Sequence, residues 1–174
     1  AIRAVMGQSI APVMIVDMGS ASTKIYIVEY GVVKSSHVIN SGGQNITQTL
    51  SKSLDVSITK AEELKREFGM YQDQLNKDEN AVNIKEMITR GLDRIFMEAG
   101  KVLLQYQKKN NKNVSRVVLT GVVATTKDLL PFAKSHFEVE VSLSDPFSKI
   151  ESPAFFESVL KEVGPGFTVA IGLA

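Results

Sequence analysis

The first part of the chain alternates between short apolar runs and turn residues, which is typical of strands joined by tight turns. Val13 to Val16 is continuously apolar, as a strand buried on both faces is. Lys24 to Tyr30 and Ser35 to Ile39 are rich in isoleucine, tyrosine and valine and follow short turns. The pattern therefore predicts a three-stranded meander.

After the third strand the apolar positions take up helical spacing. They recur every four residues from Ile46 to Leu54, directly after a Gly42-Gly43 break, which predicts a short helix. A second helix is predicted next, because Thr59 and Glu62 have the spacing of a capping box and Gly69 is a natural C-terminal stop.

The second half of the chain contains the longest predicted element. Met70 to Asn83 is polar and aperiodic and predicts a loop, whereas Ile84 to Tyr106 keeps helical spacing through about six turns. The pattern beyond this helix predicts strands at Val114 to Leu119 and Val139 to Leu143, helices at Lys127 to Phe137 and Ala154 to Val163, and a break at Gly164-Pro165-Gly166 before a strand-like run, Phe167 to Ala174. This order of elements predicts an α/β fold, with a mixed sheet flanked by helices.

Composition narrows the class of protein only a little. With 174 residues, 44% of them hydrophobic, the chain is long enough to bury a core. Its 20 Lys and Arg against 19 Asp and Glu leave no charge surplus that would favour nucleic acid as a partner. Because there are no cysteines, a disulfide framework is excluded and a reducing compartment is favoured.

Targeting signals and the two ends of the chain add two further expectations. No apolar run approaches 18 residues and the first residues lack the basic-then-apolar pattern of a signal peptide, so a cytoplasmic protein is expected. The chain begins at Ala1 and stops at "FTVAIGLA" with no capping or turn signal, which indicates a piece of a longer protein.

The turn Asp17 to Thr23, "DMGSAST", is the first candidate for chemistry. A turn of small residues exposes backbone N–H groups that bind phosphate oxygens, and an aspartate at the end of a strand can hold Mg²⁺ through water. The alternative is a tight hairpin in which Gly19 supplies a positive φ and Ser20 and Ser22 cap the loop. No Walker motif or G-x-G-x-x-G follows, which argues against P-loop and Rossmann chemistry.

Two further candidates follow along the chain. Glu62 and Lys65 share one helix face and could grip ribose hydroxyls, although a capping glutamate and a solvated lysine explain them equally well. Gly121 ends a buried strand before a helix, where open α/β sheets bind ligands, although an ordinary strand-to-helix turn has the same pattern. His37 and His136 have no partners at metal-ligand spacing and are expected to be structural.

Together and in this order, these motifs resemble the second half of an actin-like ATPase. The resemblance covers Pro12 to Ala174 and is carried by "DMGSAST" as a second phosphate loop, "AEELK" as a ribose-contacting helix and "VLTG" as the strand entering an adenosine motif. It implies one lobe of an actin/Hsp70-like fold, with a core at 12–56 and 114–174, a helical subdomain at about 57–113, and the first lobe absent.

Within that superfamily the chain most resembles the PilM family of type IV pilus assembly proteins, with the FtsA cell-division family as a close relative. The motifs "SGGQNITQTL", "AEELKREFG", "SDPFSKI" and "VAIGLA" carry this resemblance. The FtsA family usually has a richer Gly-Gly-Gly-Thr-Thr phosphate loop, whereas positions 20 and 21 here are Ser and Ala, which favours the pilus family.

The resemblance implies a cytoplasmic nucleotide-binding scaffold at the inner face of the cell membrane. Its partner would be the cytoplasmic tail of a membrane-anchored pilus protein, and self-association is a further expectation. The roles carried over by position are Asp17 for Mg²⁺ through water, Gly19, Ser20, Ala21 and Ser22 for the phosphates, Thr23 for bracing the turn, Glu62 and Lys65 for the ribose, and Gly121 and Val122 for adenine.

One departure from the family weakens the expected ATP and Mg²⁺ site. The family motif has Gly-Gly and a small residue where this chain has Gly121, Val122 and Val123. β-Branched residues resist positive φ and fill space where a purine would lie on bare backbone. With the first lobe also absent, hydrolysis by this segment alone is not expected. The alternatives are an FtsA-like filament protein and a sugar or acetate kinase-type enzyme of the same superfold.

Overall fold

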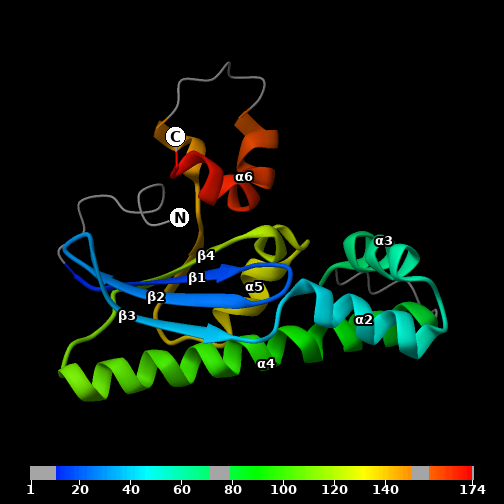
Figure 1. Ribbon diagram of the computed structural model, residues 1–174, viewed down its shortest axis with the longest axis horizontal. Helices are drawn as coiled ribbons and strands as arrows, with labels where there is room; N and C mark the ends of the chain where they lie inside the picture. The colour runs from blue at the N-terminus through cyan, green and yellow to red at the C-terminus, as the bar shows by residue number, and fades with distance from the viewer. Residues whose placement is uncertain (1–10, 71–78, 150–156, 174) are drawn as a thin grey trace.

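A five-stranded mixed sheet forms the centre of the protein (Figure 1). The computed structural model describes residues 11–70, 79–149 and 157–173. The spatial order of the strands is β3-β2-β1-β4-β5, with bounds β1 Val13–Met18, β2 Thr23–Glu29, β3 Val32–Ile39, β4 Arg116–Thr120 and β5 Glu140–Leu143. The predicted meander and the α/β fold with a mixed sheet are confirmed.

Strand direction explains why the candidate residues lie at one edge of this sheet. β1 pairs antiparallel with β2 and parallel with β4, so Asp17 lies between Lys24 on one side and Thr120 on the other. The predicted burial of β1 on both faces is confirmed, because Val13 to Val16 are completely buried. The carboxyl ends of β1 and β4, where ligands bind in open α/β sheets, therefore meet.

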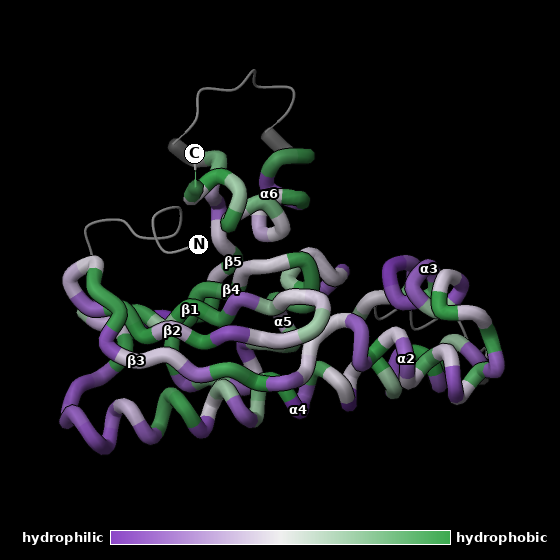
Figure 2. The backbone as a smooth tube through the Cα atoms, viewed as in Figure 1, coloured by the Kyte–Doolittle hydropathy of each residue, from purple (hydrophilic) through white to green (hydrophobic). Residues whose placement is uncertain are grey.

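In the view of Figure 1, α4 and α5 lie below the sheet, and α6 lies above it and packs on the turns that follow β4 and β5. Figure 2 shows apolar stretches in the strands of the sheet and in α6. The helices are α2 Gly43–Leu54, α3 Ile58–Phe68, α4 Glu79–Asn110, α5 Leu129–Lys134 and α6 Glu157–Ile171, with short 3₁₀ turns at η1 Val122–Thr125 and η2 Pro146–Lys149. Within the described residues, no helix is long and apolar enough to cross a membrane.

The long helix α4 supplies much of the core beneath the sheet. Its apolar positions Ile88, Leu92, Ile95 and Phe96 are at most 1% exposed, so the periodicity that predicted a long helix is confirmed. The helix begins at Glu79, so the predicted loop is wrong for residues 79–83, and the rest of that loop lies largely outside the described residues.

The predicted break at Gly164-Pro165-Gly166 and the strand-like run after it are wrong. These glycines and the proline lie inside α6, which continues to Ile171. Tertiary contacts override the local signal, because the buried Thr168 hydroxyl bonds to Ser144 Oγ at 2.8 Å and to the Pro165 carbonyl oxygen at 3.1 Å. The Pro165 carbonyl also accepts from the backbone N–H of Gly121 at 2.8 Å, which ties α6 to the end of β4.

Two other predicted helices also differ from the structure. The helix predicted from Lys127 to Phe137 is shortened to α5, because Asp128 lies in the left-handed region with φ 56° and cannot continue a helix. The helix predicted from Ala154 begins outside the described residues and does not end at Val163, since α6 runs on from it.

We expect Thr168→Val to lower the free energy of unfolding by about 1–3 kcal/mol, because valine keeps the volume but removes one of the two hydroxyl partners of the buried Ser144 side chain, the other being Thr120. The matched control is Thr125→Val, an exposed threonine whose hydroxyl donates to the Val122 carbonyl, with an expected change within about 0.5 kcal/mol. Urea unfolding measures both. Equal losses in the two variants would contradict a role for the buried network.

Candidate functional site

The loop between β1 and β2 has its carbonyl groups occupied. Gly19 N–H donates to the Ser22 carbonyl at 3.1 Å and closes the turn. The carbonyls of Gly19 and Ser20 accept from Gly43 N–H at 3.1 Å and Gln44 N–H at 2.8 Å, which are the first amides of α2. The turn is therefore fastened to the N-terminus of α2.

The amide groups of the same loop are left open. Among the described residues, none accepts a hydrogen bond from the backbone N–H of Ser20, Ala21 or Ser22. Successive free N–H groups in a turn suit an anion, and the nearby positive end of α2 adds to that preference. Gly19 is not at positive φ, so that part of the hairpin alternative is wrong, although the turn does join the antiparallel strands β1 and β2; a Cβ at Gly19 would lie 2.9 Å from the Ser22 carbonyl oxygen.

Two contacts hold this loop against the segment before α2. The buried Thr23 hydroxyl donates to the Ser41 carbonyl at 2.9 Å. Gly42 packs directly on the loop, because a Cβ at this position would lie 2.5 Å from the carbonyl oxygens of Gly19 and Ser20. Only a residue without a side chain allows this approach of the two backbones.

Asp17 lies beside this turn at the end of β1. Burial raises the pKa of its carboxyl, and the neighbouring Lys24 only partly opposes that effect. No described residue donates a hydrogen bond to the carboxylate. Gly121, with φ 91°, leaves room for it, because a Cβ there would lie 2.8 Å from Asp17 Oδ1.

This aspartate fits the way Mg²⁺ is bound in nucleotide sites. Mg²⁺ keeps several waters and needs only one or two carboxylates beside the phosphates. In the parts of the chain that the structure describes, no cluster of three or more His, Cys, Asp or Glu side chains could hold a metal by itself. His136, expected to be structural, pairs with Asp93 at 2.8 Å instead.

The N-terminus of α3 corrects one sequence interpretation. Ser57 is the N-cap, and its hydroxyl accepts from Lys60 N–H at 3.2 Å. The predicted capping box of Thr59 and Glu62 is therefore wrong, because the helix begins earlier. Glu62 is left without a capping role.

Glu62 belongs to a cluster around Lys65, whose side chain is only 13% exposed rather than solvated. The Lys65 ammonium donates to Glu62 Oε2 at 2.6 Å, to Thr47 Oγ1 at 2.9 Å and to the Gly43 carbonyl at 3.2 Å. These three acceptors use all three donors of the ammonium group. The lysine thus fastens α3 to the first turn of α2.

The electrostatics of Glu62 follow from the same contacts. Burial alone would raise the pKa of its carboxyl, but hydrogen bonds from Lys65, Thr47 and Arg66 outweigh burial and hold the pKa below its usual range. Glu62 therefore stabilises the fold above the pKa of an unfolded glutamate, and that contribution is lost as pH falls through the lowered pKa. Its side chain keeps 34% exposure toward solvent.

Gly43 is the residue at which the three candidate motifs meet. It bonds to the turn through its N–H and to Lys65 through its carbonyl, and a Cβ on it would lie 3.0 Å from Val123 Cγ2. From the sequence, the Gly42-Gly43 doublet is interpreted as a break before a helix and as part of a family motif, without a role in the site, and Thr47 is not singled out. A glycine pair between a strand and a helix was the signal available.

The adenine side of the site differs from the sequence argument in one respect. Of the residues Gly121 to Val123, only the glycine has positive φ. Both valines lie in the η1 turn, so the resistance of valine to positive φ has no bearing here. Val123 is 6% exposed and fills the space beside Gly43, while Val122 is 51% exposed.

We expect Lys65→Ala to lower the free energy of unfolding by about 1–3 kcal/mol, because Glu62, Thr47 and the Gly43 carbonyl lose their common donor. The control is Lys60→Ala on the same helix, whose side chain is 55% exposed and pairs with Glu63; there we expect a change within about 0.5 kcal/mol. Chemical denaturation of both variants measures the difference. Losses of the same size would show that the Lys65 cluster has no special role.

The amino-acid sequence matches a known protein family. The family model described as "Cell division protein FtsA" matches residues 14–159. The cell division protein FtsA of Neisseria meningitidis serogroup B (strain ATCC BAA-335 / MC58) is 28% identical over 180 aligned positions, covering 92% of this chain and 41% of the relative. FtsA of Bacillus subtilis (strain 168) is 38% identical over 68 residues, covering 38% of this chain and 16% of that protein. The chain thus spans less than half the length of these relatives.

Solved structures share the fold. The structure described as a PilM-PilN type IV pilus biogenesis complex matches with a TM-score of 0.78 and 21% identity, over 95% of this chain and 46% of the other. MreB5 of Spiroplasma citri bound to ADP matches with a TM-score of 0.67 and 15% identity, over 93% of this chain and 58% of the other. Since the family model covers most of its length and these actin-like folds align with nearly all of it, the chain belongs to the FtsA family within the actin-like ATPase superfamily.

Proposed function

We propose that this chain is the nucleotide-binding lobe of an actin-like scaffold protein, and that it holds the phosphates of a nucleotide on the turn Gly19–Ser22. The observation that carries the proposal is the different state of the carbonyl and amide groups in that turn. Its carbonyls at Gly19 and Ser20 bond to α2, and the amides of Ser20, Ala21 and Ser22 remain without acceptors among the described residues. Such a turn is suited to phosphate oxygens.

Asp17 would hold Mg²⁺ through water, and the ion would neutralise charge on the phosphates. The half-buried carboxylate has no donor among the described residues, so it is available to metal-bound water. Thr23 would brace the turn through its bond to Ser41.

The ribose contact would be made by Glu62, with Lys65 as a positioning residue. Lys65 already donates to three acceptors within the protein, whereas Glu62 keeps part of its carboxylate exposed. Gly121 and Val122 would meet adenine, but Val123 fills space beside Gly43, so the base would add little affinity.

Displacement of a bound ATP analogue by other ligands tests whether the phosphates, rather than adenosine, supply most of the affinity. Using a fluorescent ATP analogue, we expect Mg²⁺-dependent binding with a Kd of about 1 mM or weaker. ATP, ADP and inorganic tripolyphosphate should displace it at similar concentrations, and adenosine should not. Displacement by adenosine alone, or binding unaffected by removal of Mg²⁺ with EDTA, would overturn the phosphate-centred site. Micromolar affinity would contradict the small contribution assigned to the base beside Val123.

In the cell, we propose that the protein is a scaffold and that bound nucleotide stabilises one of its conformations. Partner proteins would hold this scaffold at the inner face of the membrane. Two assemblies are candidates. Docking of the cytoplasmic tail of a membrane-anchored pilus protein is supported by the likeness to the structure of a PilM-PilN complex. A self-associating role in division is supported by the FtsA family model and relatives.

Deletion of the gene distinguishes these assemblies. Loss of surface pili with normal division supports the pilus scaffold, and long undivided cells with normal pili support the division scaffold. Normal pili and normal division would contradict both.

A further inference from the structure

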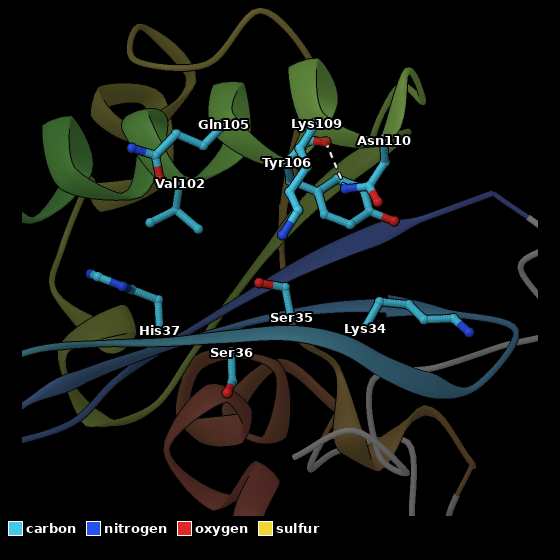
Figure 3. Close-up of a pocket in the computed structure, with 9 residues that line it drawn as sticks. All are labelled: Lys34, Ser35, Ser36, His37, Val102, Gln105, Tyr106, Lys109 and Asn110. Atoms are coloured by element: carbon cyan, nitrogen blue, oxygen red, sulfur yellow. Dashed lines mark hydrogen bonds between the residues drawn. The ribbon is translucent and has the colours of Figure 1, made fainter.

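A cavity lies between the edge strand β3 and the C-terminal half of α4, away from the turn described above (Figure 3). Its volume is about 270 Å³, room for a side chain or a small polar group. The described residues that line it are Lys34, Ser35, Ser36, His37, Val102, Gln105, Tyr106, Lys109 and Asn110, and none of these is acidic. None of these residues belongs to the proposed nucleotide site.

The strand beside the cavity has an open edge. β3 is the last strand on its side of the sheet, and no described residue bonds to its outward backbone groups. It also exposes three valines, Val32 at 56%, Val33 at 41% and Val38 at 55%. An exposed sheet edge of this kind is a template for a further strand.

A β-bulge places Lys34 on the same side of the strand as Ser35. The pairing with β2 shifts between Ile27 and Val28, which pair with Ser35 and Val33 and leave Lys34 as the additional residue. In Figure 3, Lys34 and Ser35 leave β3 on its α4 side, with the Lys34 side chain then running along the strand, whereas Ser36 points away. Beyond the bulge, pairing is regular from Ser35 to Ile39, so that part of the edge remains straight.

The charge of the cavity selects for an anion. Lys109 reaches from the helix toward β3, Lys34 lines the strand side with its chain running along β3, and the amide groups of Gln105 and Asn110 are further potential donors. The Asn110 amide also donates to the Tyr106 carbonyl at 2.9 Å, which orders that end of the wall. Lys109 also lies in the last turn of α4, where its positive charge offsets the negative end of the helix dipole.

We propose that the groove between β3 and α4 binds an extended segment of a partner protein, which adds as a strand to β3 and places an acidic side chain in the cavity. Backbone hydrogen bonds to the open edge supply affinity, and the cavity supplies the preference for a carboxylate. This inference does not depend on the proposed nucleotide site, since it uses none of the same residues.

Peptides of defined sequence test it. The probe is a fluorescein-labelled octapeptide of alternating valine and threonine with one central glutamate, followed by fluorescence anisotropy with the chain. We expect the same peptide with central glutamine to bind about five- to tenfold more weakly, and one with central lysine about a hundredfold more weakly. Two peptides N-methylated on the two alternate sets of backbone nitrogens should differ, because only the set that faces β3 supplies the donors of an added strand; methylation of that set should abolish binding.

Variants of the chain locate the site. Lys109→Glu should weaken the glutamate peptide about tenfold or more, and the matched control Lys108→Glu, on the same helix turn but outside the cavity lining, should leave it within about twofold. Lys34→Glu is the second variant, from the opposite wall, and circular dichroism checks the fold of each. Equal effects of Lys108→Glu and Lys109→Glu, equal affinity for glutamate and lysine peptides, or no binding at about 1 mM would overturn the proposal.

Discussion

Replacing Gly42 with alanine should lower the free energy of unfolding by about 2–4 kcal/mol and weaken nucleotide binding about tenfold or more. The new Cβ would lie 2.5 Å from the carbonyl oxygens of both Gly19 and Ser20, and both obstacles are backbone atoms that cannot rotate away. The turn and the N-terminus of α2 must separate. That separation breaks the bonds from Gly43 and Gln44 that orient the turn.

The control for this variant is Gly100→Ala in α4. Nothing lies within 4 Å of a Cβ there, and alanine is the better helix former, so we expect a gain of about 0.5–1 kcal/mol. Thermal and urea unfolding measure both substitutions. If Gly42→Ala stays within about 0.5 kcal/mol of the parent chain, the turn does not depend on its contact with α2.

Asp17→Asn should affect stability and ligand binding in opposite directions. Burial raises the pKa of Asp17, so the charged form destabilises the native state and the neutral amide should raise the melting temperature at pH 7. The same substitution removes the carboxylate available to Mg²⁺ water, so Mg²⁺-dependent nucleotide binding should weaken about tenfold or more.

The pH dependence of that gain follows from the sign of the shift. An acid with a raised native pKa favours folding most at pH below its unfolded value, about 3.9, and the advantage is lost as pH rises through the raised pKa. The gain of Asp17→Asn should therefore vanish in acid and be complete at neutral pH. Asp128→Asn, at an exposed left-handed position that asparagine tolerates, serves as the control with no expected gain. A gain independent of pH would contradict the assignment to ionisation.

The periodicity of apolar residues predicted those helices and strands whose buried face follows from the spacing of neighbouring residues in the sequence. The meander and α4 follow from alternation and from a repeated apolar face, each of which is visible within a short window. The end of the chain could not be predicted in this way, because Thr168 and Pro165 in α6 are held by Ser144 and by the Gly121 backbone, both distant in sequence.

The candidate site shows the same limit. The turn and Gly121 could be identified from small residues at strand ends, but the sequence offered two local explanations for Glu62 and Lys65 that the structure replaces with one cluster. What joins the motifs is Gly43, whose importance comes from three contacts made by a residue without a side chain. Such contacts leave no periodic signal in a single sequence.

The most direct test of the account is an NMR titration of the chain with Mg·ADP and Mg·ATP, following the backbone amides of the β1–β2 turn. Because the amides of Ser20, Ala21 and Ser22 lack acceptors among the described residues, the account predicts that their resonances move together and saturably. The movement should be lost in Asp17→Asn and on removal of Mg²⁺. Saturable nucleotide binding that leaves these three amides unmoved, or no movement at about 10 mM nucleotide, would contradict the phosphate site.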